Sequence, residues 1–186
     1  MKAKFLNKNK LVLIIWIIGL LVQSPVLAQP IINPPDYMTP AWDQVLQGNA
    51  RFIVLPNIAS AAVLDRETGL VWQLAPSSPI LTWPNAVLFC SNLTVGTRKG
   101  WRLPTIWELT SLVDTSVTTA PLLPIGNPFI GVQPGGYWSA TTSANLLANA
   151  YFLQFQSGTV GTNGKSGTAF VWCVRGAGGL DPQPVQ

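Results

Sequence analysis

The stretch GWRLPTIWEL, residues 100–109, decides the fold expected for this chain. Its Thr105 and Glu108 have the spacing of a capping box. In that motif the threonine side chain accepts from the backbone N–H of the glutamate, and the glutamate side chain accepts from the backbone N–H of the threonine. Because such a pair marks the first turn of a helix, the sequence predicts a helix over residues 106–113.

Arg102 stands between a tryptophan and the start of that helix. A guanidinium is always charged and carries five donors in a rigid fork, so it can hold a carboxylate or several carbonyl oxygens. The pattern favours a structural role, in which Arg102 ties the loop before the helix to the sheet, to Glu108 or to Asp114. The alternative is an arginine that recognises a sulfate or carboxylate on a sugar.

A second helix is predicted upstream, in LTWPNAVLFCSNL, residues 81–93. Thr82 is the expected cap, and Pro84 lies in the first turn, where its missing N–H removes no hydrogen bond. Ala86, Cys90 and Leu93 recur at the spacing of a buried helix face. Both helices therefore precede the C-terminal third of the chain.

Strands are expected on both sides of the helices. Alternation and turn residues predict strands near residues 51–55, 61–64 and 70–73, then at 137–142, 150–156, a short one after Ser157-Gly158, and 169–175. In the last of these, both alternating faces are apolar, as expected of a central strand. Residues 115–136 are rich in Pro, Gly and Thr and are predicted to form a long surface loop. The fold class is α+β, with two helices flanking a twisted, mostly antiparallel sheet.

Tryptophan is abundant, and one copy differs from the others by its position. Trp107 lies opposite the apolar face of the helix predicted after the capping box, so it is expected to face outward, where it could stack on a sugar or contact a protein. The other possibility is that the 115–136 loop covers it. The remaining tryptophans of this region are expected in the core: Trp72, Trp83, Trp101, Trp138 and Trp172.

The N-terminus predicts export. Residues 1–28 combine four lysines, twelve consecutive apolar residues (11–22) and a Val-Leu-Ala end, which is the pattern of a signal peptide. An uncleaved N-terminal anchor is the alternative. Residues 29–41 are expected to form a proline-rich linker, 42–176 the domain and 177–186 a flexible tail. The expected location is periplasmic or extracellular, and the protein is not expected to be integral to the membrane.

Charge disfavours a polyanionic partner. Four of the eleven basic residues lie in the predicted signal peptide, so the remaining seven balance the seven acidic residues. Attraction to a polyanion requires a surplus of positive charge on one face, and only Arg98, Lys99 and Arg102 form a local cluster. Nucleic acid is therefore not an expected partner.

Two cysteines and the absence of histidine limit the possible chemistry. In an oxidising compartment Cys90 and Cys173 are expected to form a disulfide, worth about 4.5 kcal/mol for a loop of that length. A reactive or metal-binding thiol pair is the alternative. The absence of histidine excludes Ser-His-Asp and Cys-His catalysis and His-ligated metals. Asp65 and Glu67 could act as a glycosidase carboxylate pair, but the DRETG sequence around them favours a turn.

These segments together resemble the family named after the C-terminal domain of the Lcl collagen-like adhesin. The resemblance spans residues 42–176 and rests on Leu64-Asp65, Thr68-Gly69-Leu70, Trp72, Trp83, Ala86, Cys90, Gly100 to Thr105, Glu108-Leu109, Leu112-Val113-Asp114, Tyr137-Trp138-Ser139, Phe155, Gly158 and Cys173 to Gly176. It implies a C-type lectin-like fold. Formylglycine-generating enzymes share a similar RLPT segment, and the adhesin relative is implied to bind sulfated polysaccharides as a trimer.

The sequence and the resemblance lead to one functional hypothesis. We expect an exported, non-catalytic module that recognises a surface glycan or a protein, with Trp107, Arg102, Arg98 and Lys99 as candidate binding residues. No cofactor or metal is expected, because the carboxylate triplets of calcium-dependent lectins are absent. An oligomer is possible. The alternatives are an enzyme of the formylglycine-generating or glycosidase type, and a structural envelope domain without a soluble ligand.

Overall fold

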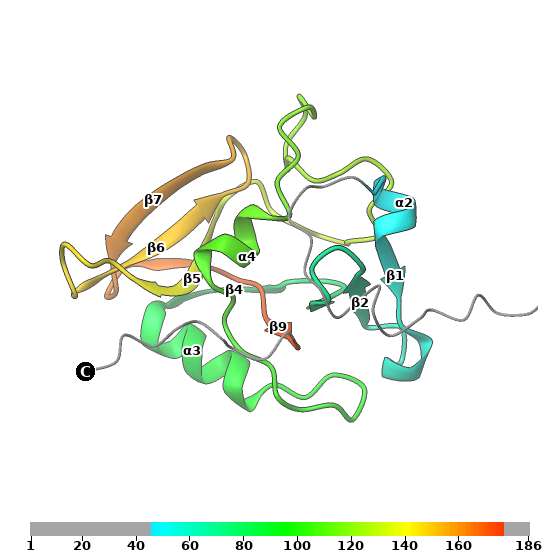
Figure 1. The fold of residues 1–186 in the computed structure, drawn as a ribbon. Coiled ribbons are helices and arrows are strands. Elements are labelled where there is room, and N and C mark those ends of the chain that lie inside the picture. Colours follow the sequence, from blue (N-terminus) through cyan, green and yellow to red (C-terminus); the bar gives the residue numbers. More distant parts are fainter. Residues whose placement is uncertain (1–45, 177–186) are drawn as a thin grey trace, which may run out of the picture. The chain divides into compact units, whose positions relative to one another are not determined.

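The computed structural model describes residues 46–176 (Figure 1). The predicted signal peptide, linker, tail and first four residues of the domain lie outside the described residues. The helical elements are α2 (Gly48–Arg51), the short 3-10 helix η1 (Pro56–Ile58), α3 (Trp83–Asn92) and α4 (Ile106–Thr110). The strands are β1 (Phe52–Val54), β2 (Ala62–Asp65), β3 (Val71–Gln73), β4 (Ser77–Thr82), β5 (Gly136–Thr142), β6 (Asn149–Gln154), β7 (Thr159–Gly164), β8 (Thr168–Val171) and β9 (Val174–Arg175).

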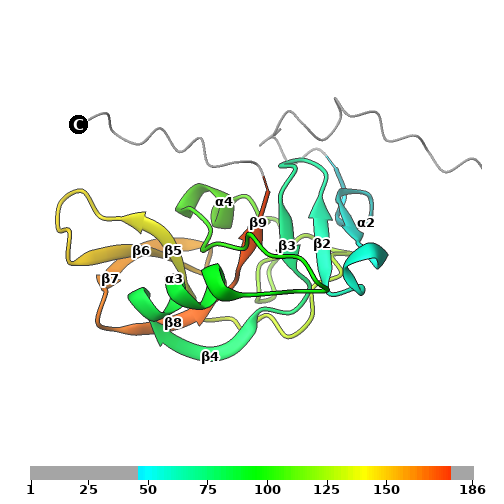
Figure 2. The same cartoon turned by 90° about the horizontal axis from the view of Figure 1, so that it is seen from below.

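The strands form two sheets instead of the single sheet that was expected. One has the order β1-β2-β3-β9 and is antiparallel, whereas the other has the order β4-β8-β5-β6-β7 and is antiparallel except for the parallel pair β5–β8. Figures 1 and 2 show α3 and α4 on opposite sides of the five-stranded sheet. The α+β class and the two flanking helices are therefore confirmed, and the single sheet was wrong.

The predicted strand at residues 169–175 is divided between the two sheets. It leaves the larger sheet after Val171 and enters the smaller one at Val174. Gln73 holds the segment between the two sheets in place. Its side-chain Oε1 accepts from the backbone N–H of Cys173 at 2.8 Å, and its backbone carbonyl accepts from the Trp172 indole N–H at 3.0 Å. Both faces of this segment are apolar because it crosses between two cores, and not because it is one central strand.

Two apolar cores flank the larger sheet. The first contains Trp72, Trp172 and Tyr137 together with Leu109 of α4, and the second contains Trp138 and Trp101 with residues of α3. The ring of Trp172 contacts those of Trp72 and Phe129 edge to face, at 5.5 and 4.8 Å between centroids. Edge-to-face packing of this kind stabilises a core beyond simple burial.

Four of the five tryptophans assigned to the core are buried, and the fifth was misplaced. Trp83 is half-buried at the start of α3, where its indole donates to the Ser139 carbonyl at 2.8 Å. The Lys165 ammonium lies 4.2 Å from its ring centre. A cation over the ring requires an open face, so Trp83 belongs to the rim of the second core.

Both predicted helices exist, with differences at their ends. The Thr105–Glu108 capping box is present, but α4 ends at Thr110. After Thr110 the chain continues with 3-10-type hydrogen bonds, in which the Leu112 amide donates to the Leu109 carbonyl and the Val113 amide to the Thr110 carbonyl. This tighter turn directs the apolar side chains of Leu112 and Val113 into the core. Thr82 occupies the cap position of α3 without a side-chain cap bond, because it also ends β4, a strand that the sequence did not predict.

The 115–136 segment contains no helix or strand before Gly136, as expected of a loop. It is not confined to the surface, because Leu123 is buried and Phe129 packs against Phe52 with ring centres 5.0 Å apart. The amide of Ile130 also bonds the Leu74 carbonyl at 3.0 Å. This loop therefore closes one side of the first core.

Candidate functional site

Arg102 forms the corner that its sequence position suggested. Its Nη1 and Nη2 donate to the two carboxylate oxygens of Glu108 at 2.7 and 2.6 Å. The same carboxylate accepts from the backbone N–H of Thr105 at 2.8 Å as part of the capping box. The backbone of Arg102 exchanges two hydrogen bonds with Val174 of β9. One residue thus connects the start of α4 to the smaller sheet, and the predicted link to an acidic residue is confirmed.

The basic cluster predicted around this corner is composed differently. Arg98 and Lys99 are exposed, and their side chains form no hydrogen bond or ion pair with the described residues. Arg102 contributes little free charge because Glu108 neutralises it. Arg175 takes its place beside Lys99, since its Nε donates to the Lys99 carbonyl at 2.8 Å. No local pattern pointed to this neighbour, which lies 76 residues away along the chain.

Trp107 faces outward, as predicted from its helical position. Its side chain is 72% exposed, so the 115–136 loop does not cover it. It lies on α4, one residue before Glu108. An exposed indole can form a contact with a ligand, but Trp107 lines neither of two surface hollows, one on the larger sheet and one along α3.

Asp65 and Glu67 are buried and already bound to a cation. Asp65 accepts from Arg51 Nε and Nη2 at 2.8 and 2.7 Å, and Glu67 Oε2 lies 3.1 Å from Arg51 Nη1 outside hydrogen-bond geometry. Asp65 also accepts from the Thr68 hydroxyl and the Glu67 amide, and Gly69 has a φ of 69°. The turn interpretation is therefore supported. The role of Arg51 was missed, because nothing in the sequence distinguishes it from the other arginines.

The two cysteines are joined. Cys90 on α3 and Cys173 between β8 and β9 form a disulfide with 5.5 Å between Cα atoms, across a separation of 83 residues. The predicted disulfide is confirmed, and the alternative of a reactive thiol pair is contradicted. The bond ties α3 to the segment that links the two sheets.

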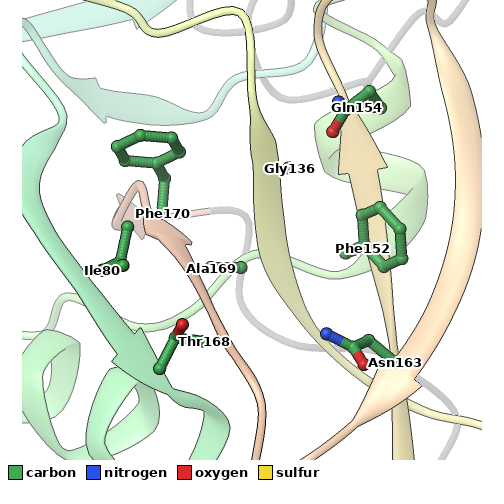
Figure 3. Close-up of a pocket in the computed structure, with 8 residues that line it drawn as sticks. All are labelled: Ile80, Gly136, Phe152, Gln154, Asn163, Thr168, Ala169 and Phe170. Carbon is green, nitrogen blue, oxygen red and sulfur yellow. The ribbon is translucent and has the colours of Figure 1, made fainter.

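A groove on the larger sheet was not predicted from the sequence. It has a volume of about 250 Å³, and its lining residues come from all five strands of that sheet, β4 to β8 (Figure 3). Ile80, Thr168 and Phe170 lie on one side of Gly136, and Phe152, Gln154 and Asn163 lie on the other. Ala169 completes the lining, in which no residue is ionisable.

Glycines make room for the aromatic rings of this groove. A Cβ at Gly136 would lie 3.0 Å from the Phe152 ring, and one at Gly161 would lie 2.8 Å from it. A Cβ at Gly135 would lie 2.5 Å from the ring of Phe170. The Phe152 ring therefore lies across the backbones of β5 and β7, where only glycine leaves enough space.

Two amide side chains beside these rings have no partner. The amides of Gln154 and Asn163 form no hydrogen bond with any described residue, although both residues pair through their backbones in the ladder between β6 and β7. Each amide offers two donors and an acceptor. Aromatic surface next to amides that have no protein partner, without charge, suits a neutral ligand that has both apolar C–H and hydroxyl groups.

A buried phenol lies beneath this region. Tyr137 follows Gly136 on β5, and its hydroxyl accepts from the backbone N–H of Gln133 at 2.8 Å. Burial raises the pKa of Tyr137 to about 12, and the bond from Gln133 opposes this in part. The phenol is therefore neutral at any physiological pH, and it adds no charge near the groove.

Residues 46–176 contain no helix long and apolar enough to cross a membrane. Within the same residues, no three His, Cys, Asp or Glu side chains gather as metal ligands would.

The sequence profile of the Lcl C-terminal domain matches residues 61–175. No curated protein matches the chain in sequence. The matched region runs from β2 to β9, so it contains the Arg102 corner, the disulfide and the groove, whereas Arg51 precedes it.

Proposed function

The chain belongs to the Lcl C-terminal domain family, and from this premise we propose that it is an exported, non-catalytic module that binds an uncharged glycan in the groove around Phe152. The observation that carries the proposal is the pairing of an aromatic surface with two unpartnered amides. Sugar rings present C–H groups that pack on aromatic faces and hydroxyls that bond amides. The C-type lectin-like fold is part of the same proposal, supported by the helices on both sides of the larger sheet.

The lining of the groove favours a neutral sugar over a sulfated one. A sulfate brought there would lose its hydration and find no cation among the lining residues. A pyranose ring would lose little, because its hydroxyls could bond Gln154 and Asn163. The volume of about 250 Å³ is below the usual range for drug-sized ligands, which suits recognition of one or two sugar units.

Several features support a binding role over catalysis. Both cysteines are held in the disulfide, and the carboxylates of Asp65 and Glu67 are engaged by Arg51. The groove contains no acid or base that could move a proton. The disulfide also supports export, because such bonds persist in oxidising compartments.

A glycan array with the protein tests the proposal, followed by titration of the best neutral glycan against variants. Gln154→Ala and Asn163→Ala should each weaken binding about tenfold, which corresponds to the loss of one hydrogen bond. Neither change should lower stability much, because neither side-chain amide forms a hydrogen bond within the described residues. Asn145→Ala, another exposed asparagine at the β5–β6 turn, is the matched control and should bind as the wild type does.

Trp107 supports a second candidate, a protein contact on α4, since exposed tryptophans often anchor such interfaces. If Trp107→Ala abolishes binding of the array ligand while both groove variants keep it, the groove is not the site. Absence of any neutral glycan among the ligands would also refute the proposed function.

A further inference from the structure

The last strand of the larger sheet, β7, has an unprotected edge. Its six residues, Thr159–Gly164, pair with β6 along their whole length, and within the described residues no strand lies on the other side. Figure 1 shows β7 along the outer margin of the sheet. An open edge is a template for pairing with another strand, and proteins usually block it with charge, proline, a bulge or a covering segment.

The other sheet edges in the described residues carry such protection. The strand β4 contains Pro79 and a register shift between Ser77 and Leu81, and β1 has three residues. The outer side of β9 is occupied by Arg102, which pairs with Val174. By contrast, β7 has no charged residue, no proline and an unbroken register.

The hydrogen-bond register shows which groups β7 offers. Lys165 donates its backbone N–H to the Ala148 carbonyl at 2.8 Å, which places position 165 among those that bond β6. Bonded and free positions alternate along an antiparallel ladder, so Gly161 and Asn163 also bond inward. The N–H and C=O groups of Val160 and Thr162 therefore point away from the sheet.

We propose that β7 pairs with β7 of a second copy of this chain, antiparallel and centred on Gly161. In this register Val160 lies opposite Thr162 of the partner subunit. By symmetry, Thr162 lies opposite Val160 of the partner subunit. Each of these two pairs exchanges two backbone hydrogen bonds, so the outward N–H and C=O groups of Val160 and Thr162 are satisfied in each chain. The two Gly161 residues meet at the axis, where the absence of side chains lets the backbones approach.

This symmetric pairing has a consequence for binding. A two-fold axis between antiparallel edge strands stands perpendicular to the sheet, so both copies present the same face. The groove lining includes Asn163 of β7, and Gly161 makes room for its Phe152 ring. Two grooves therefore open side by side on a continuous ten-stranded sheet, twice the five strands of one copy. A polymer with repeated sugar units could occupy both, and this part of the inference rests on the proposed function.

The contact is a narrow one, since a register centred on Gly161 pairs only residues 159–163 of the two strands, and its area falls below the roughly 1,200 Å² typical of stable complexes. We expect a weak dimer, measured by sedimentation equilibrium up to about 1 mM protein, where even millimolar affinity produces a measurable fraction. A protein that stays monomeric throughout this range would overturn the proposal. Binding of the neutral glycan by that monomer would leave the proposed function intact.

Thr162→Pro tests the edge itself. It removes an N–H that points outward, a position at which edge strands tolerate proline, so circular dichroism should show a folded domain and sedimentation a monomer. Thr94→Pro, at an exposed position after α3, is the matched control and should dimerise as the wild type does. Dimerisation of folded Thr162→Pro at wild-type strength would refute the register.

Cross-linking tests the register without depending on that variant. Opposed Cα atoms in a bonded antiparallel pair are about 5.5 Å apart, within the reach of a disulfide. A mixture of Val160→Cys and Thr162→Cys chains should cross-link on mild oxidation, whereas either variant alone should not, because equal positions do not face each other. No cross-link in the mixture, or equal cross-linking of the single variants, would contradict the proposed pairing.

Discussion

Replacing Arg102 by alanine tests the corner between α4 and the smaller sheet. The change removes both bonds to Glu108, whose side chain is 10% exposed, while that of Arg102 is 32% exposed. Breaking a fully buried pair costs about 3–5 kcal/mol, and losing an exposed pair costs at most about 1. The intermediate burial and the remaining bond from Thr105 to Glu108 place the expected loss near 2 kcal/mol.

A loss of this size should lower the melting temperature by about 8 °C, at about 4 °C per kcal/mol for a domain of this length. Differential scanning calorimetry measures it, with Arg98→Ala as the control, because that exposed arginine has no partner and its loss should change stability by less than about 0.5 kcal/mol. Arg102→Lys should restore only part of the loss, since an ammonium cannot donate to both carboxylate oxygens as the fork does.

A wild-type melting temperature for Arg102→Ala would contradict the structural role of Arg102. If that variant also lost binding of the array ligand, Arg102 would be a ligand-binding residue and not a structural one. A double-mutant cycle with Glu108→Gln separates the pair from its surroundings, because the coupling should account for most of the loss of either single variant.

Three further predictions concern other parts of the domain. Arg51→Ala leaves the buried carboxylates of Asp65 and Glu67 without a cation and should cost about 3–5 kcal/mol in urea unfolding; a loss below about 1 kcal/mol would refute a stabilising ion cluster. Retention on heparin should disappear by about 0.2 M salt, because few cations are free, and strong retention at higher salt would contradict the charge argument. Since the pKa of Tyr137 is raised from 10.0 to about 12, its contribution to stability is complete below pH 10 and lost as the pH rises toward 12; an unfolding free energy that is flat across this interval would show that the phenol is not buried.

Features encoded within a few residues were predictable from the sequence. The capping box requires only Thr105 and Glu108 three positions apart in one turn, and the turn at Asp65 requires only its own side chain and Gly69. The outward position of Trp107 follows from helical periodicity alone. In each case the interacting groups are close along the chain, so no knowledge of tertiary structure was needed.

Features that depend on distant segments were not predictable in the same way. The end of α4 depends on the burial of Leu112 in the first core. The division of residues 169–175 between two sheets depends on Gln73, which is 100 residues from its partner Cys173. A continuous apolar segment is compatible with one central strand or with a crossing between two cores, and local pattern cannot separate them.

The groove was missed for a different reason. It depends on side chains that are absent at Gly135, Gly136 and Gly161, and a Gly-Gly pair such as 135–136 usually indicates a turn or loop in a sequence. Its lining comes from several strands, so no compact motif marks it. The buried Arg51 was missed because its acidic partners follow 14 and more residues later, with a strand hairpin between them.

The position of the strand β9 determines when the domain can complete its folding during synthesis. Both sheets depend on the segment at residues 168–175, since β8 separates β4 from β5 and β9 forms the edge beside β3. A nascent chain that ends before this segment has neither sheet closed and no partner for Cys90. Contacts over such long separations form late and slowly. The domain is therefore expected to stay incompletely folded until residues 168–175 have emerged from the ribosome.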